Sequence, residues 1–294
     1  MNEEIAYLVD SAGSLPRGIL KEYQIMEVPF YYTFDGKTYF RENVDGDNAD
    51  FFRHMQEHPQ QVPHTAAPNV NDWMQAFQKV GQQGFRKIIV TTISSGLSAS
   101  FQNAHLARNM YLSSEEAAEI EIEVMTSSSC ACGQAALEIK IAQMIHENQL
   151  SWEEICLRAK ALIPGLTTLF TVKNLIYMKA GGRIGGATAF MGRLINIKPI
   201  CEFINGVVRP LKAVRGSKKA LMAMADECCS RIKQVANPVI CTQNALCEED
   251  ETFMIDYLHS LLGYDGPIYR GMLGAVVGAH SGPGSIGIGY VGES

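Results

Sequence analysis

The chain has 294 residues, of which 47% are hydrophobic and 19% are charged. This balance is typical of a globular protein with a sizeable core, and it excludes a disordered, collagen-like or coiled-coil chain. The formal net charge of −6 at neutral pH gives no overall attraction to nucleic acid or to an anionic membrane surface. We therefore expect no nucleic-acid partner.

The amino terminus and the cysteine content indicate a protein that stays in the cytoplasm. Residues 1–10 are acidic where a secretory signal needs a basic region followed by an apolar run. The eight cysteines have no regular spacing, so we expect reduced thiols and no disulfide. The longest stretch without a charged residue, 271–292, holds eight glycines and suits turns and strand ends better than a membrane-spanning helix.

Strand-like and helical segments alternate through the first half of the chain, which predicts a parallel α/β sheet with right-handed βαβ crossovers. The strand-like segments are 5–10, 87–92 and 120–126. Helical spacing of apolar residues follows Asn71 and again Ser95, and both side chains are able to cap a helix. A further helix is expected from the capping box at 151–154 to the Pro164-Gly165 pair.

The balance of charge changes along the chain, and we place a domain boundary near residue 158. Residues 1–158 include 21 acidic and 11 basic residues, whereas residues 159–294 include 10 acidic and 14 basic residues. Most of the positive charge lies between Lys173 and Lys219, which indicates either an anionic partner or a solvated face with scattered lysines. In this half we expect a helix from Ser217, a strand from Pro238 and a buried strand from Met272.

The signatures of several enzyme and metal-binding classes are missing. Residues 282–287 match GxGxxG, but a dinucleotide site needs a following helix and a later acidic residue, and only seven residues remain. The chain has neither a P-loop nor a GxSxG motif. His54 and His58 lack HExxH order, and Cys130 and Cys132 lack a second pair at zinc-finger spacing. We therefore expect no metal and no cofactor.

Four short loops rich in glycine and small polar residues are predicted at strand ends, namely 10–16, 64–68, 94–98 and 280–284. Ligands bind at the carboxyl ends of parallel strands, so these loops should converge. Ser95 and Gly96 would occupy the first turn of a helix, where free N–H groups favour an anion. Thr65 and His280 would add further donors. The set predicts a pocket for a carboxylate or phosphate, without an obvious nucleophile–base pair.

Each of these residues also has a purely structural interpretation. Ser95 can simply cap the helix that follows it. Thr65 can organise the proline-containing turn, and His280 can be a hydrogen-bonded core residue. Ser11 can cap a helix that begins at Leu15-Pro16. The residues alone do not identify the anion.

Six segments of the chain resemble, in the same order, the motifs of the DegV family of bacterial fatty-acid-binding proteins. In the first half they are DSAGSLP at 10–16, HTAAP at 64–68 and ISSGLSASFQNA at 93–104. In the second half they are AGGRIGGATAFMGRLINIKPI at 180–200, RGSKKA at 215–220 and HSGPGSIGIGY at 280–290. The resemblance spans nearly the whole chain.

The resemblance implies two α/β domains, 1–158 with a parallel sheet and 159–294 with a mixed sheet, which hold a long-chain fatty acid between them. The tail would lie in an apolar tunnel. The carboxylate would be presented to the catalytic subunit of a separate ATP-dependent fatty acid kinase, which makes an acyl phosphate. The chain would then be a lipid carrier without catalysis of its own, and transient contact with a membrane would be compatible with that role.

The resemblance also assigns residues. Thr65, Ser95 with Gly96, and His280 would bind the fatty acid carboxylate. Further contacts with the site or the kinase would come from Ser11, Arg183, Arg209 and Arg215. The chain departs from the family pattern at two places, because Ala66-Ala67 replaces Ser-Gln and Ala99-Ser100 replaces Gly-Thr.

Two other functions stay open on the sequence. The first is a hydrolase that uses Ser95, with His280 as base, on an acyl ester, although no nucleophile elbow or orienting acid is evident. The second is a lipid-binding protein without a kinase partner, in which the acid is a structural ligand or a signal. The sequence has no recognisable pattern for the chain length and unsaturation of the fatty acid or for the oligomeric state of the protein.

Overall fold

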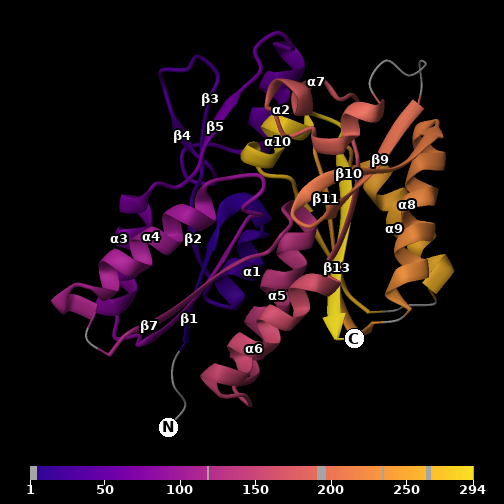
Figure 1. The fold of residues 1–294 in the computed structure, drawn as a ribbon. Coiled ribbons are helices and arrows are strands. Elements are labelled where there is room, and N and C mark those ends of the chain that lie inside the picture. Colours follow the sequence, from indigo (N-terminus) through magenta and orange to yellow (C-terminus); the bar gives the residue numbers. More distant parts are fainter. Residues whose placement is uncertain (1–4, 118, 191–196, 234, 263–265, 294) are drawn as a thin grey trace.

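The computed structural model describes residues 5–117, 119–190, 197–233, 235–262 and 266–293 (Figure 1). Two sequence patterns extend beyond this range, because residues 1–4 of the acidic amino terminus and residues 191–196 of the 180–200 motif lie outside the described residues. Within the described ranges, no helix has both the length and the apolar character needed to cross a membrane.

The first sheet, sheet A, is parallel throughout, as the alternation of strands and helices predicts. Its order is β2-β1-β6-β7, with strands β1 (Ile5–Asp10), β2 (Met26–Val28), β6 (Lys87–Thr92) and β7 (Glu121–Thr126). Leu8 of β1 packs with helices α3 (Val70–Gln82) and α4 (Ser100–Leu112), whereas Val9 packs with α5 (Ala131–Glu147) and α6 (Trp152–Leu162). The alternation of side chains thus buries both faces of the sheet.

The second sheet, sheet C, is mixed, as the resemblance implies. Its order is β10-β9-β8-β13-β11-β12, with β8 (Thr167–Thr171), β9 (Ile197–Ile204), β10 (Val207–Arg215), β11 (Ala236–Asn244), β12 (Ile268–Met272) and β13 (Ile286–Glu293). Of these neighbours, β11 and β12 run parallel and the other pairs are antiparallel. Helices α8 (Ser217–Ile232) and α9 (Glu248–Leu262) cover one face (Figure 1).

Helix α5 lies between sheets A and C and joins their cores (Figure 1). Its apolar side chains share one cluster with Val9 of sheet A and Val239 of sheet C. Gly289 of β13 approaches the helix so closely that a Cβ atom there would lie 2.6 Å from the carbonyl carbon of Cys132. The chain passes from one sheet to the other after α6, and residue 158 lies inside α6. The domain boundary at 158 stays a prediction.

The third sheet, sheet B, is antiparallel with the order β4-β3-β5 and consists of β3 (Tyr31–Thr33), β4 (Phe40–Arg41) and β5 (His64–Ala66). Helices α2 (Asn48–Glu57) and α10 (Ala275–Ser281) share its apolar cluster. The other helical segments are α1 (Arg17–Glu22), α7 (Ile176–Ala180), η1 (Ser11–Gly13), η2 (Glu115–Ala117), η3 (Ile163–Gly165) and η4 (Gly185–Phe190). Sheet B, which belongs to the first half of the chain, thus packs against α10 of the second half.

The predicted strand from Met272 is wrong. Strand β12 ends at Met272, and the following apolar run forms helix α10 from Ala275. Most residues of this short helix are buried, so no polar face reveals a helical period. His280 therefore lies in the last turn of a helix, not in a loop at a strand end.

Two predicted helix starts are also wrong, as is the alternative interpretation of Ser11 as a helix cap. Ser95 and Gly96 lie in a turn, and α4 begins only at Ser100. Helix α3 is capped by Asn69, whose side chain accepts from two backbone N–H groups, and not by Asn71. Ser11 caps no helix at Leu15-Pro16, because α1 begins at Arg17 without a side-chain cap. The capping box at 151–154 is confirmed at the start of α6.

Candidate functional site

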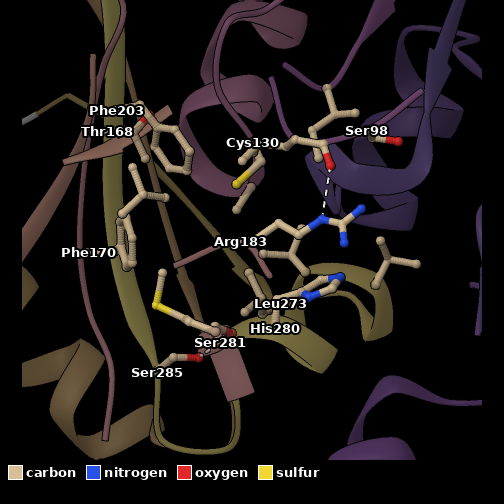
Figure 2. A pocket seen from close by; sticks show the side chains of 18 of the residues that line it. Ser98, Cys130, Thr168, Phe170, Arg183, Phe203, Leu273, His280, Ser281 and Ser285 are labelled. Atoms are coloured by element: carbon tan, nitrogen blue, oxygen red, sulfur yellow. Dashed lines mark hydrogen bonds between the residues drawn. The ribbon is translucent and has the colours of Figure 1, made fainter. Parts of the chain in front are cut away.

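A cavity of about 220 Å³ lies between the two halves of the chain (Figure 2). Three of the four predicted loops contribute to its wall, through Thr65, Leu97 and His280 among others, whereas loop 10–16 does not. Most of the lining side chains are apolar, including Phe30, Ile93, Met178, Phe203, Val208, Leu273 and Val276. A largely apolar cavity with a few polar groups in its wall is typical of a small-molecule site.

Thr65 and His280 meet at the polar end of the cavity. The Oγ1 atom of Thr65 and the Nε2 atom of His280 are 3.0 Å apart. Thr65 lies in the edge strand β5, where pairing with Tyr32 sets the direction of its side chain. His280 lies in α10, which packs against the same sheet. One hydrogen bond thus joins the two halves at the cavity wall.

His280 is neutral over the physiological pH range. Burial, Arg183 and His64 lower the pKa of its imidazole to about 4. The Nδ1 atom is buried and has no hydrogen-bond partner among the residues that the structure describes. A buried acceptor without a partner is more readily tolerated than a buried N–H without one, which favours the tautomer with the proton on Nε2. Nε2–H then donates to Thr65, and the Thr65 hydroxyl is free to donate to a ligand.

Gly181 makes room for this imidazole. A Cβ atom at position 181 would overlap Nδ1 of His280. Arg183, two residues further on, donates from Nη1 to the Gly181 carbonyl at 2.7 Å and from Nε to the Leu97 carbonyl at 3.1 Å. Arg183 also lines the cavity. The 180–200 motif therefore places one cation beside the polar end and fixes it to the loop after β6.

The opposite side of the cavity is mainly aromatic and apolar, although Thr168 also lies there, beside Phe170 and Phe203 (Figure 2). The rings of Phe170 and Phe203 lie 5.6 Å apart, and Figure 2 shows them across the cavity from Arg183 and His280. Burial raises the pKa of the nearby Cys130 thiol to about 12, so this group stays uncharged. The cavity therefore has a polar end and an apolar end, as an amphipathic ligand requires.

Ser95 and Gly96 do not line the cavity. Both residues are exposed, and the Ser95 N–H donates to Thr126 Oγ1 at 3.2 Å. Gly96 packs against the turn between β9 and β10, where a Cβ atom at position 96 would lie 2.9 Å from the Gly206 carbonyl oxygen. The cavity is instead reached by the next residues of the loop, Leu97 to Ala99. Because His280 bonds Thr65, the structure does not contain the Ser95–His280 pair that a hydrolase would use.

The other predicted contacts lie away from the cavity wall. Ser11 is fully buried and donates to the carboxylate of Glu42. Arg209 and Arg215 lie on β10, and both are exposed. No group of three or more His, Cys, Asp or Glu side chains in the described ranges could hold a metal ion.

Asp10 is a residue of the site region that the sequence analysis missed. Its Oδ2 atom accepts from the Ile93 N–H at 2.9 Å and from Ser100 Oγ at 2.7 Å. Its Oδ1 atom accepts from Gln134 Nε2 at 2.8 Å. Asp10 thereby fixes the loop after β6 to both α4 and α5. An aspartate at the end of a buried strand is the sequence feature that points to this role, because a buried carboxylate needs several hydrogen-bond donors.

Comparison with known sequences identifies the family. The profile of a family described as "Uncharacterised protein, DegV family" matches residues 4–293. A DegV domain-containing protein of Listeria innocua is 30% identical over 297 residues, which cover 98% of each chain. Protein DegV of Bacillus subtilis is 28% identical over 287 residues, which cover 97% of this chain and 98% of the relative.

Solved structures have the same fold. A crystal structure described as a fat acid (stearic acid)-binding protein from Eubacterium ventriosum has a TM-score of 0.91 and 27% identity, and the match covers 98% of both chains. DegV from Bacillus subtilis, described as a fatty acid binding protein, has a TM-score of 0.84 and 25% identity, covering 99% of this chain and 100% of that chain. With its parallel and mixed sheets and a profile match over nearly its whole length, the chain belongs to the DegV family.

Proposed function

We propose that the protein binds a long-chain fatty acid and presents its carboxylate to a separate ATP-dependent kinase. The observation that carries the proposal is the hydrogen-bonded pair Thr65–His280 at the polar end of an apolar cavity. Relatives with the same fold and 25–27% identity are described as fatty-acid-binding proteins, which supports the same class of ligand here.

The tail of the acid would supply most of the binding free energy. Each buried methylene group contributes about 0.8 kcal/mol, so a chain of roughly fifteen contributes on the order of 12 kcal/mol before the costs of ordering. Phe170 and Phe203 line the part of the cavity that would hold the tail. The head group would contribute orientation, because a buried carboxylate that lacks one donor loses about 1–3 kcal/mol.

The carboxylate would accept a hydrogen bond from the Thr65 hydroxyl, which His280 orients through Nε2. Arg183 would neutralise part of the negative charge from its place beside the polar end. Ser95 and Gly96 are exposed in the adjoining loop, so in this proposal they belong to the surface that meets the kinase and not to the head-group contacts.

In the kinase reaction, an oxygen of the fatty acid carboxylate would attack the γ-phosphorus of ATP, and ADP would leave. The products would be an acyl phosphate and ADP. The partner would bring the ATP, which agrees with the missing P-loop in this chain. Arg183, Arg209 and Arg215 are candidates for contact with the new phosphate or with an acidic kinase surface.

A native mass spectrum, followed by organic extraction and lipid mass determination, tests the ligand. We expect one fatty acid per chain, and protein without extractable lipid that also fails to bind added oleate would overturn the proposal. The kinase step is tested by adding ATP and a purified fatty acid kinase catalytic subunit, with acyl phosphate trapped by hydroxylamine. We expect hydroxamate from the wild type and a reduced rate from Arg209→Glu; an unchanged rate in the variant removes Arg209 from the kinase surface.

Two rival functions predict different results in the same assays. A hydrolase that acts alone would release fatty acid from an acyl ester without a partner, and a carrier releases none. A lipid-binding protein without a kinase would retain the acid but give no hydroxamate with the kinase subunit and ATP. Binding and phosphorylation are therefore measured separately.

A further inference from the structure

Helix α10 begins without a side-chain cap of its own. Its N-cap residue is Gly274, and Ala275 and Val276 at its start are buried, so the N–H groups there need acceptors inside the molecule. Ser14 Oγ accepts from the Gly274 N–H at 2.9 Å, and Glu42 Oε1 accepts from the Val276 N–H at 2.7 Å. A helix of the second half is thus capped by side chains of the first half.

Glu42 is held at both carboxyl oxygens. Its side chain is 0% exposed, and Oε2 accepts a hydrogen bond from Ser11 Oγ while Oε1 meets Val276. Ser11 Oγ in turn accepts from the Phe30 N–H at 2.9 Å. Two residues of the 10–16 loop therefore help to cap α10. Ser14 accepts from the helix start directly, and Ser11 acts through its hydrogen bond to Glu42.

A buried carboxyl group is a costly way to cap a helix. Serine or asparagine would accept the same hydrogen bond at a lower cost of desolvation. The neighbouring carboxyls of Glu27 and Asp10 add to this cost, and with burial as the main cause the pKa of Glu42 rises to about 8. The glutamate side chain is long enough to reach α10 from the loop after β4, and a Cβ atom at position 274 would overlap its Oε1 atom.

The first turn of α10 is one helical turn away from the head-group site. Val276 and His280 are four residues apart on a helix of seven residues, so they lie on one face, about 6 Å apart along the axis. Both side chains line the cavity. A displacement of the first turn would therefore also move the imidazole of His280.

We propose that Glu42 is a positioning residue for the head-group site, because it holds α10 where His280 Nε2 stays within hydrogen-bond distance of Thr65 Oγ1. The inference rests on the proposed function for its ligand, a fatty acid. The geometry that it concerns consists of contacts between the protein's own residues.

The first test compares Glu42→Ala and Glu42→Gln with the wild type, by titrating delipidated protein with oleate and with methyl oleate. Glu42→Ala should lower the affinity for oleate about tenfold, as expected for one lost hydrogen bond to a buried group. The affinity for the neutral ester should change much less, because the ester gains little from the Thr65–His280 pair. Glu42→Gln should resemble the wild type, since its amide oxygen can still accept from Val276.

Glu138→Ala is the matched control. Glu138 is also 0% exposed, and its Oε1 atom accepts a hydrogen bond at 2.8 Å from Nε2 of Gln134, a residue of α5 and not of α10. Its loss should lower stability but keep the ratio of oleate to methyl oleate affinities. If Glu42→Ala does not fold, Glu42→Asp replaces it, because its carboxyl group is one methylene shorter and cannot hold both Ser11 and Val276.

The second test needs no ligand. The NMR signal of the His280 Cε1–H group, assigned with His280→Asn, should shift in Glu42→Ala and stay in place in Glu42→Gln and Glu138→Ala. An unchanged signal together with an unchanged affinity ratio in Glu42→Ala would overturn the inference, as would equal changes in Glu138→Ala. If the wild type binds no oleate, the proposed function fails, and the NMR signal still decides whether Glu42 positions His280.

Discussion

Thr65 and His280 are 215 residues apart in the sequence, yet Thr65 Oγ1 lies 3.0 Å from His280 Nε2. The bond connects the edge strand of the small antiparallel sheet with the helix that precedes the last strand of the mixed sheet. With the proton on Nε2, the imidazole donates across this bond and leaves the Thr65 hydroxyl free to donate to a ligand. The polar end of the cavity therefore exists only when both halves of the chain are in place.

The first prediction concerns this pair. Thr65→Val should lower the affinity for oleate by about 1–3 kcal/mol, which is roughly 5- to 150-fold, because the carboxylate loses its hydroxyl donor. His280→Asn should have a smaller effect, and adding it to Thr65→Val should cost nothing further, since His280 acts through the hydroxyl. Calorimetric titration of the four proteins forms a double-mutant cycle. Fully additive losses would show that the two residues act independently.

Gly181→Ala should reduce the preference for oleate over methyl oleate. The new Cβ atom would overlap Nδ1 of His280 and push the imidazole away from Thr65. Gly18→Ala is a suitable control, because in the described residues no atom beyond its chain neighbours and the backbone of its own helix lies within 4 Å of the added Cβ. The measurement is the ratio of the two dissociation constants. An unchanged ratio in Gly181→Ala, with the fold retained, would contradict the assigned place of His280.

Phe203→Ala should weaken oleate and methyl oleate by the same factor. A buried phenylalanine contributes about 1.5–3 kcal/mol through its apolar surface, so the expected loss is roughly 10- to 150-fold for either ligand. Phe253→Ala removes a partly buried ring of α9, away from the cavity wall, and should leave both affinities unchanged. A loss confined to the acid would mean that Phe203 acts on the head group.

The stability of the protein should depend on pH through Glu42. The pKa of this carboxyl is raised from 4.5 to about 8 by burial, with Glu27 and Asp10 contributing, so the unfolded chain releases its proton at a lower pH than the folded protein. The contribution of Glu42 to stability is therefore lost as pH rises from about 4.5 to about 8. Glu42→Gln has no such proton. The free energy of unfolding of the variant relative to the wild type should increase over this range.

Urea denaturation at pH 5, 6, 7 and 8 measures this difference. The lowered pKa of His280, about 4, acts in the opposite direction, because stability is lost as pH falls from 6.5 toward 4. His280 is present in both proteins, so its effect cancels in the comparison. Parallel stability curves for the two proteins would contradict a raised pKa at Glu42.

The sequence predicts Thr65 and His280, the two residues that the proposed function assigns to the head group, but the physical argument for them is only partly correct. The loops at 64–68 and 280–284 attract attention through their small polar residues, and both do reach the cavity. Neither lies at the carboxyl end of a parallel strand, since Thr65 is within an antiparallel strand and His280 is within a helix. Three strands of sheet A, β1, β6 and β7, are predicted almost to the residue because their apolar runs are long. The short strand β2 is not predicted, because it has only three residues.

Glu42 and the true place of Ser95 could not be predicted. Glu42 bonds Ser11 and Val276, which are separated from it by 31 and 234 positions in the sequence. No local sequence pattern therefore reveals it. Ser95 resembles a helix cap, but the chain makes a further turn before α4 begins, and Leu97 to Ala99 reach the cavity instead. The run after Met272 lacks a polar face, which makes a buried helix and a buried strand indistinguishable by period.

A crystal structure of the wild-type protein with oleate tests the central claim most directly. We expect electron density for one acyl chain in the cavity, with a carboxylate oxygen within about 3 Å of Thr65 Oγ1 and the tail beside Phe170 and Phe203. A chain bound in the reverse direction, or a carboxylate bound away from Thr65 and His280, would contradict the account.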